Sequence, residues 1–300
     1  MFDFFGKVKL QNSPRCYAGF DIKKASPKEF ILGVATGEFL DGAHLFMQTG
    51  RLYHPDAQIV IFCDTAVSQK NIDLAMGLDI VLQPINKNAI SRSYHIQNSR
   101  FIEYLKFVLS TSKDSMFFLS DTRDVFFQKN IFSQYSKNEF SEYDLHVFEE
   151  SNKTFLVECK YNSRWLRNMF GTPTLDAHSE QTIICSGTTL GNWKGMVEYL
   201  SLMISLYQVY PNLRPDASDQ GAHNVIVRDN LLQSTVKIYP QKNELVYTYS
   251  RGDLVDLNES LEFCGVTPAC VHQYDRAGSN EIERWLEAFS GNKIRTKIGN

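Results

Sequence analysis

A pair of aspartates closes the most apolar strand that the sequence predicts. Residues 116–120 read MFFLS, and Asp121 and Asp124 follow at once. Ligands of open α/β sheets bind beyond the carboxyl ends of the strands, so a substrate would lie beside these carboxylates. A hard divalent cation neutralises such a pair and leaves coordination positions for phosphate oxygens. The pattern favours a metal site for a nucleotide diphosphate. The local alternative is that Asp121 caps a turn and Arg123 pairs with either aspartate.

Three further polar residues have the chemistry that such a site needs, and each also has a plain structural alternative. His272 offers an imidazole, a common ligand of divalent metals, or it is an ordinary core histidine. Asp219 has the carboxylate of a general base, and aspartate is also among the best residues to cap a helix. Arg100 leads a predicted helix, where its guanidinium either forks onto a phosphate or carboxylate or stays exposed.

The elements that position these residues alternate in the first half of the chain. Apolar, β-branched runs predict strands, and amphipathic spacing predicts helices between them. Strands that alternate with helices indicate a mostly parallel central sheet. We expect strands at residues 30–35, 58–63, 79–82 and 116–120, and helices at 42–53, 72–76 and 100–109.

The second half of the chain has a different pattern. Residues 162–180 have no clear period, which suggests a loop or a lid. No linker, repeat or low-complexity tract divides the sequence, so one domain is the economical interpretation. We expect strands at residues 145–148 and 182–185, and helices at 192–210, 222–232 and 281–289.

Composition excludes several classes of protein. The chain has 300 residues, 43% of them hydrophobic, which allows a sizeable core. Its formal net charge of -3 gives no basis for bulk attraction to nucleic acid. The six cysteines form no C-x-x-C pair, and Cys185 lies in an apolar run where a thiol behaves as a small hydrophobe. We expect reduced thiols, no signal peptide, no transmembrane segment and a cytoplasmic location.

Four segments occur in the order used by GT-A-fold glycosyltransferases, which the sequence resembles over roughly residues 30–276. FLSDTRDVFFQ at 118–128 is similar to their D-x-D segment, and CSGTTLG at 185–191 resembles the N-S-G turn of glycogenin-like enzymes. DQGAHN at 219–224 resembles the D-Q-G-x-x-N segment of those enzymes, and VHQY at 271–274 resembles the segment whose late histidine is the third metal ligand. The sequence departs from the pattern twice: the acidic pair is D-x-x-D, and Cys185 replaces the usual asparagine.

The resemblance implies a fold and a set of site residues. The fold is a mixed, mostly parallel α/β sheet flanked by helices in a single GT-A-like domain over residues 1–300, with a nucleotide-binding half at about 28–135 and an acceptor and catalytic half at about 136–290. A Mn²⁺ or Mg²⁺ ion is expected on Asp121, Asp124 and His272, with Asp219 as the catalytic residue. Binding of the nucleotide-sugar donor is expected from Thr36, Gly37, Arg100, Arg123, Ser186 and Gly187, and binding of the acceptor from Gln220 and Trp165.

The implied reaction is metal-dependent transfer of a hexose from a nucleotide sugar, with UDP-galactose or UDP-glucose favoured, to a hydroxyl of a glycan acceptor. Synthesis of a surface polysaccharide is one setting, and a lipid-linked acceptor would bring the protein to the membrane surface. The sequence has no G-x-G-x-x-G after a strand, no P-loop and no G-x-S-x-G, which argues against dinucleotide oxidoreductases, P-loop kinases and serine hydrolases. Two alternatives stay open: a metal-dependent sugar nucleotidyltransferase, and a carbohydrate-binding domain without turnover.

Overall fold

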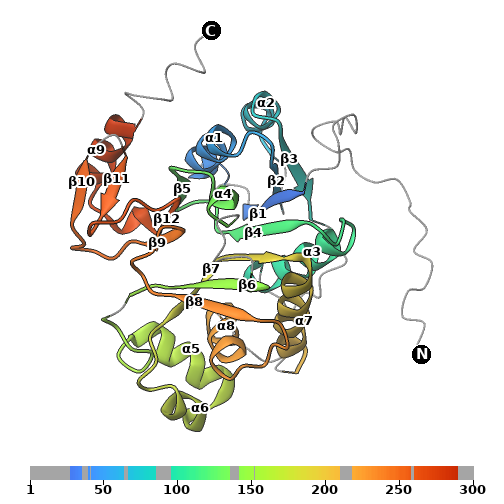
Figure 1. Ribbon diagram of the computed structural model, residues 1–300, viewed down its shortest axis with the longest axis vertical. Helices are drawn as coiled ribbons and strands as arrows, with labels where there is room; N and C mark the ends of the chain where they lie inside the picture. The colour runs from blue at the N-terminus through green and yellow to red at the C-terminus, as the bar shows by residue number, and fades with distance from the viewer. Residues whose placement is uncertain are drawn as a thin grey trace.

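Seven strands form the central sheet of the protein in a computed structural model (Figure 1). Their order across the sheet is β3-β2-β1-β4-β7-β6-β8. The strands are β1 (Glu29–Ala35), β2 (Gln58–Cys63), β3 (Ile80–Pro84), β4 (Met116–Ser120), β6 (Leu145–Glu149), β7 (Ile184–Asn192) and β8 (Val236–Tyr239). The structure describes residues 28–35, 40, 42–63, 67–85, 96–135, 142–151, 153–209, 218–257 and 260–289.

The sheet is mixed, and most of its pairings are parallel. β1 pairs in parallel with β2 and β4, β2 with β3, and β6 with β8. β7 runs antiparallel to both of its neighbours, β4 and β6. The mostly parallel sheet expected from the sequence is therefore confirmed. The reversed strand β7 also returns the chain to the carboxyl end of β4.

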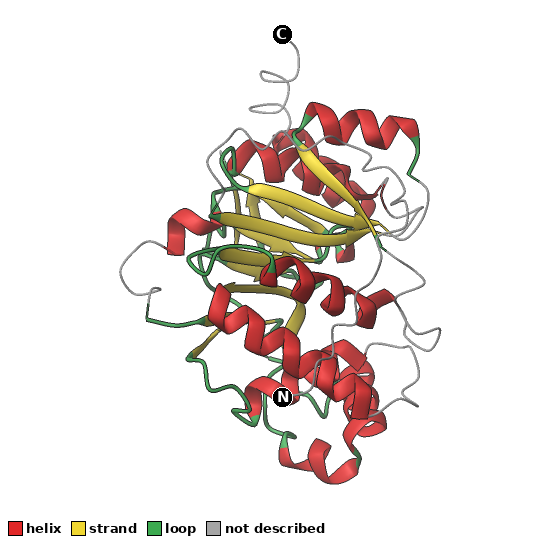
Figure 2. Cartoon of the chain, turned by 90° about the vertical axis from the view of Figure 1, so that its right-hand side faces the viewer, coloured by secondary structure: helices red, strands yellow, loops and turns green. Residues whose placement is uncertain are grey.

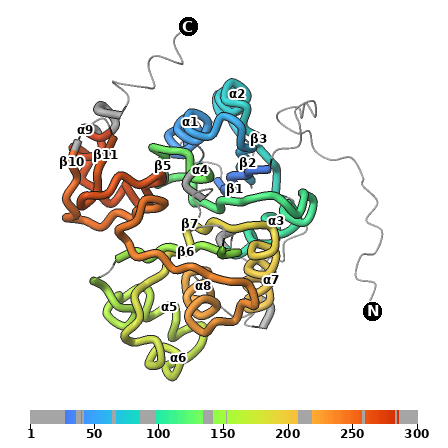
Figure 3. Tube along the Cα trace, in the orientation of Figure 1, coloured from blue at the N-terminus to red at the C-terminus, as the bar shows by residue number. Residues whose placement is uncertain are grey.

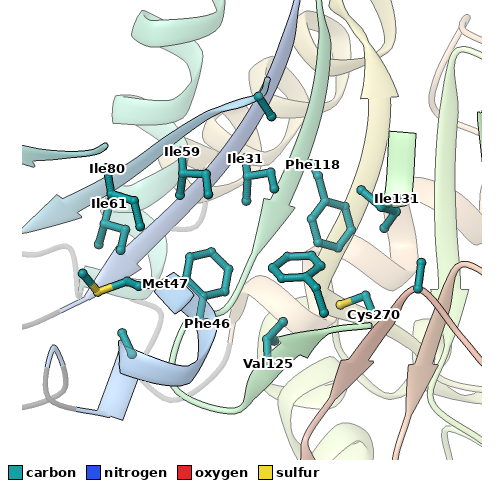
Figure 4. Close-up of a cluster of buried hydrophobic side chains, with 14 of the residues drawn as sticks. Ile31, Phe46, Met47, Ile59, Ile61, Ile80, Phe118, Val125, Ile131 and Cys270 are labelled. Atoms are coloured by element: carbon teal, nitrogen blue, oxygen red, sulfur yellow. The ribbon is translucent and has the colours of Figure 1, made fainter. Parts of the chain in front are cut away.

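Helices cover both faces of this sheet (Figure 2). Successive residues of a strand point to opposite faces, so the apolar runs feed two cores. Phe30 and Phe117 stack in one core, with ring centroids 5.3 Å apart. A strand that is buried on both sides needs a continuous apolar run, which explains the sequence MFFLS of β4. The other core includes Ile31, Phe46, Ile59, Ile61 and Phe118, drawn with their neighbours in Figure 4.

The helices agree with the sequence patterns except for the short helix at residues 131–135, which was not expected, and one longer region. α3 and α7 pack side by side on one face of the sheet, where Figure 3 shows them as adjacent coils. The helices of the first half are α1 (His44–Tyr53), α2 (Gln69–Gly77), α3 (Ile96–Leu109) and α4 (Ile131–Tyr135). Those of the second half are α5 (Lys160–Phe170), α6 (Thr172–Ala177), α7 (Trp193–Val209), α8 (Ser218–Arg228) and α9 (Ser279–Phe289).

The expected loop or lid at residues 162–180 is wrong, because α5 and α6 occupy most of that segment. Gly171, at a φ of 86°, separates the two helices. α5 does have helical spacing in the sequence, since Trp165 and Met169 lie four residues apart, although two of its four buried positions, Asn162 and Ser163, are polar. The helix packs against α8.

A smaller three-stranded sheet flanks the central one, and in Figure 1 two of its strands are orange to red and the third, β5, is green. It consists of β5 (Val125–Phe127), β12 (Cys270–His272) and β9 (Val246–Thr248), with β12 in the middle. The ribbon β10 (Val255–Leu257) and β11 (Leu261–Phe263) and the helix α9 pack beside it around Tyr249, Phe263 and Trp285. Because β5 follows directly after Asp124, this sheet brings the late part of the chain to the acidic turn.

Candidate active site

The acidic turn between β4 and β5 is hydrogen-bonded to β7 and β1, the two strands on either side of β4. The backbone N–H of Asp121 donates to the Gly187 carbonyl at 2.8 Å, which continues the pairing of β4 with β7 by one residue. The Thr122 hydroxyl donates to the Val34 carbonyl at the end of β1, at 2.9 Å. Asp121 and Asp124 therefore leave the sheet at fixed positions beyond the carboxyl end of its central strand.

His272 reaches the acidic turn through strand pairing. β12 runs antiparallel to β5, with His272 opposite Val125, the residue that follows Asp124. The His272 Nε2 atom lies 3.5 Å from Asp121 Oδ2 and 3.8 Å from Asp124 Oδ1. One ligand atom from each of the three side chains lies within 4.8 Å of the others. The structure thus brings together the three residues expected to hold a metal.

The backbone of Gly187 lies directly beside this cluster. A Cβ atom at this position would lie 2.5 Å from His272 Cε1 and 2.6 Å from Asp121 Oδ2. Such distances are far inside van der Waals contact, so only glycine lets β7 pass so close to the two ligand groups. The space that a side chain would fill is instead left beside the ligand atoms.

The cluster suits a divalent cation. Among the described residues, the His272 Nε2 atom is buried and has no hydrogen-bond partner, an arrangement that is costly unless another group satisfies this nitrogen. Two carboxylates and one imidazole offer oxygen and nitrogen ligands that suit Mn²⁺ and Mg²⁺. The donor set, the buried nitrogen without a partner and the cleared space beside Gly187 therefore all fit the metal expected from the sequence.

Opposing charges set the protonation of the three groups. Burial alone would raise the pKa of Asp121, but Arg100 and His272 lower that pKa well below its usual value. Burial raises the pKa of Asp124, against the effect of His272 and with the help of Asp121. Burial would lower the pKa of His272, but Cys185, Asp124 and Asp121 raise it well above its usual value. The two carboxylates therefore favour positive charge beside them, which a protonated His272 or a divalent cation would supply.

Arg100 joins this cluster to Asp219. Its NH1 group donates to Asp121 Oδ1 at 2.6 Å, and its NH2 group donates to Asp219 Oδ2 at 2.9 Å. The guanidinium lies on α3 and is nearly buried, so it neutralises the buried carboxylate of Asp219 and the partly exposed carboxylate of Asp121. Burial raises the pKa of Asp219, and Arg100 opposes that rise. Arg100 was expected to bind the donor. In the structure its guanidinium instead links the carboxylates of Asp121 and Asp219.

The D-Q-G-x-x-N segment docks α8 onto the edge of the site. Gln220 Oε1 accepts from the backbone N–H and the hydroxyl of Ser186, both at 2.8 Å. Gln220 Nε2 donates to the Ile184 carbonyl at 2.9 Å and to Glu150 Oε1 at 3.2 Å. Asn224 binds the backbone N–H and C=O of Ile184, both at 2.9 Å, as a neighbouring strand would. Gln220 was expected to bind the acceptor, but both ends of its side-chain amide are hydrogen-bonded to other groups of the protein.

The other predicted site residues lie at different places. Arg123 is half exposed and pairs with Asp275 at 3.0 Å, on the outer side of the acidic turn. Trp165 lies on α5, 5.9 Å from the ring of Tyr161, and its backbone is 3.7 Å from where a Cβ of Gly221 would be. Thr36 and Gly37 lie outside the described residues.

Two residues at this site did not stand out in the sequence as functional. Cys185, on β7, lies with its Sγ atom 3.4 Å from His272 Nδ1. Glu150 follows β6 directly and is hydrogen-bonded to Gln220. A signal for Glu150 was present, because it is a carboxylate at the end of an apolar strand, as Asp121 is. The signal for Cys185 was its place in the family segment, where it replaces the usual asparagine, although a thiol within an apolar run is otherwise typical of a core.

Comparisons with solved structures place the fold. The galactosyltransferase LgtC, in complex with donor and acceptor sugar analogs, is 12% identical, with a TM-score of 0.53 over 88% of this chain and 96% of that one. An active-site mutant of LgtC gives a TM-score of 0.52 at the same identity and coverage. The bifunctional enzyme WbbM, described as a glycosyltransferase in its apo form, is 13% identical with a TM-score of 0.53, over 93% of this chain and 52% of WbbM.

The chain therefore has the GT-A fold, and the fold class expected from the sequence is confirmed. No protein-family model and no curated protein sequence matches it. Among the described residues, no helix combines the length and the apolar character needed to cross a bilayer.

Proposed function

We propose that the protein is a metal-dependent glycosyltransferase that moves a hexose from a UDP-sugar to a hydroxyl of a glycan acceptor. One observation carries the proposal: Asp121, Asp124 and His272 converge around Gly187 at the carboxyl end of the central strand. In a GT-A fold that is where a bound diphosphate would lie. The glycosyltransferases among the structural neighbours support the same class of reaction.

Asp121, Asp124 and His272 would hold Mn²⁺ or Mg²⁺. When bound, the cation supplies positive charge that offsets the charge on the departing nucleoside diphosphate. Ser186 and Gly187 line the same end of β7, and we propose that they contact the donor together with Thr36, Gly37 and Arg123. UDP-galactose and UDP-glucose are the first donors to test, and the galactosyltransferase LgtC gives the first of them priority.

Asp219 is proposed as the catalytic carboxylate. It lies in the first turn of α8, nearly buried, and Arg100 ties it to the metal cluster. Its raised pKa moves the carboxylate towards the range in which a general base accepts the proton of an acceptor hydroxyl. If the reaction retains configuration, the same side chain would instead stabilise positive charge at the anomeric carbon. The stereochemistry of the product decides between these two roles.

The acceptor side of the site is proposed to lie along α5 and the start of α8. Trp165 sits there with Tyr161, whose ring is exposed, and aromatic faces pack well against sugar rings. Gln220 acts through Ser186 and Glu150, which it orients. We propose one functional unit, with the donor half at about 28–135 and the acceptor half at about 136–290, in the cytoplasm and acting on a polysaccharide or lipid-linked chain.

A donor screen followed by a turnover assay tests the proposal. Mn²⁺ with the correct UDP-sugar should raise the melting temperature, because a ligand that binds only the folded state stabilises it. Turnover should release UDP and stop in excess chelator. Release of pyrophosphate would instead identify a nucleotidyltransferase, and binding without release of any nucleotide would identify a carbohydrate-binding domain.

A matched pair of carboxylate variants locates the activity. Asp124→Ala should abolish Mn²⁺-dependent turnover. Asp114→Ala removes an exposed carboxylate near the opposite end of β4 and should leave turnover unchanged. Wild-type turnover in Asp124→Ala would refute the metal role of the cluster. The configuration of the product at its anomeric carbon, determined by NMR, then assigns the role of Asp219.

A further inference from the structure

The two nitrogens of the His272 ring have different neighbours. Nε2 faces the carboxylates of Asp121 and Asp124, while Nδ1 faces the thiol of Cys185, with Nδ1 and Sγ 3.4 Å apart. Cys185 is 2% exposed and His272 is 1% exposed, so water does not take either position. Whichever nitrogen carries the ring proton must therefore satisfy it on one of these two sides.

The sulfur of Cys185 is placed to accept from Nδ1. A ring nitrogen that binds a metal ion must present its lone pair, and Nε2 is the nitrogen that faces the two aspartates. A metal ion on Nε2 therefore leaves the ring proton on Nδ1, where Cys185 Sγ lies 3.4 Å away. Because sulfur can act as a hydrogen-bond acceptor, the thiol can satisfy this N–H inside the core. In that tautomer Nε2 offers its lone pair to the space between the two aspartates.

We propose that Cys185 is a positioning residue that holds His272 in the Nδ1–H tautomer and so prepares Nε2 to bind a metal ion. The proposal rests on the proposed function in one respect, that the group held by Nε2 is a divalent cation. Metal-binding histidines usually donate their other N–H to a carboxylate, a backbone carbonyl or water. Here the acceptor would be the thiol of Cys185.

The alternative is that Cys185 only fills space in the core. Cys63, at the end of β2, provides the comparison, since it is a buried strand thiol whose Sγ donates to the Ile61 carbonyl at 3.6 Å. Cys185 differs because its sulfur faces an imidazole nitrogen at 3.4 Å. A space-filling role would be preserved by valine, whereas the proposed role needs a group that can accept a hydrogen bond.

Three variants separate these roles by their affinity for Mn²⁺, measured by electron paramagnetic resonance without any substrate. Cys185→Val should weaken Mn²⁺ binding about 10- to 100-fold, as expected when the partner of a metal-binding histidine is lost. Cys185→Ser keeps a donor and an acceptor and should stay within about threefold of wild type. The matched control Cys63→Val should bind Mn²⁺ as wild type does.

A spectroscopic measurement on the wild-type protein does not depend on how the variants fold. With ¹⁵N-labelled histidine and diamagnetic Zn²⁺ in the site, the His272 proton should be found on Nδ1. A proton on Nε2 would overturn the inference, as would wild-type affinity for Mn²⁺ in a folded Cys185→Val variant. Either result leaves the proposed function standing. Failure of the wild-type protein to bind Mn²⁺ at all would overturn both.

Discussion

Replacing Gly187 by alanine is the sharpest single perturbation of the site. The new methyl group would be placed 2.5 Å from His272 Cε1, 2.6 Å from Asp121 Oδ2 and 2.8 Å from His272 Nε2. Gly187 does not adopt a positive φ, so alanine costs nothing in backbone conformation. The variant therefore tests the cleared space beside the ligand atoms and little else.

The size of the effect follows from the distances. Carbon atoms in contact lie about 3.5–4.0 Å apart, so His272 or Asp121 must move by about 1 Å to make room. Metal sites tolerate deviations of only about 0.2 Å in their ligand distances. We expect the dissociation constant for Mn²⁺ to rise by at least about 100-fold, which corresponds to about 2.8 kcal/mol at 1.4 kcal/mol for each tenfold.

Titration calorimetry with Mn²⁺ measures this change directly, and a thermal scan without metal checks the fold. Gly77→Ala is the matched control, because a Cβ at Gly77, the last residue of α2, would meet nothing within 4 Å. The control should bind Mn²⁺ as wild type does. A Gly187→Ala variant that binds Mn²⁺ with wild-type affinity would show that the ion, if bound, lies elsewhere, and the reasoning from this cluster would fail.

Three further outcomes are expected. Arg100→Met removes the cation shared by two carboxylates and should lower the free energy of unfolding in urea by about 3–5 kcal/mol; a loss below about 1 kcal/mol would contradict its bracing role. Asn224→Leu leaves the buried Ile184 N–H without a partner and should cost about 1–3 kcal/mol in the same assay. Burial lowers the pKa of His54 from 6.5 to about 4, so the unfolded state binds more protons in that window. Stability should therefore fall as the pH drops from 6.5 towards 4, by up to about 3 kcal/mol from this residue, and a His54→Asn variant should show a shallower slope.

The sequence predicted the part of the fold that is built from long apolar runs. β2 and β4 occupy the residues expected of them, because a strand buried on both faces needs an uninterrupted apolar segment. The acidic turn could be placed for the same reason, since it follows the end of such a run. The three-residue strands β5, β9 and β12 are too short to produce a period of two, so pattern alone cannot predict them.

That limit explains what was missed at the site. The position of His272 depends on the pairing of β12 with β5, so only the resemblance to a known family placed it beside the aspartates. Gln220 was expected to face an acceptor, but hydrogen bonds to Ser186 and Glu150 are long-range contacts that the sequence does not reveal. Cys185 was taken as a hydrophobe because its polar neighbours come from β12 and from the end of β6.

The middle strand of the small sheet is also the last of the described strands to be synthesised. β12 inserts between β5 and β9, so both wait with an unpaired edge until it arrives. Synthesis from Asp124 to His272 covers about 150 residues, which takes roughly 8–30 s at ordinary rates of translation. During that interval the nascent chain carries the two carboxylates without the imidazole. Capture of an ion by all three side chains is thus a late event, which among the described elements precedes only the packing of the C-terminal helix α9.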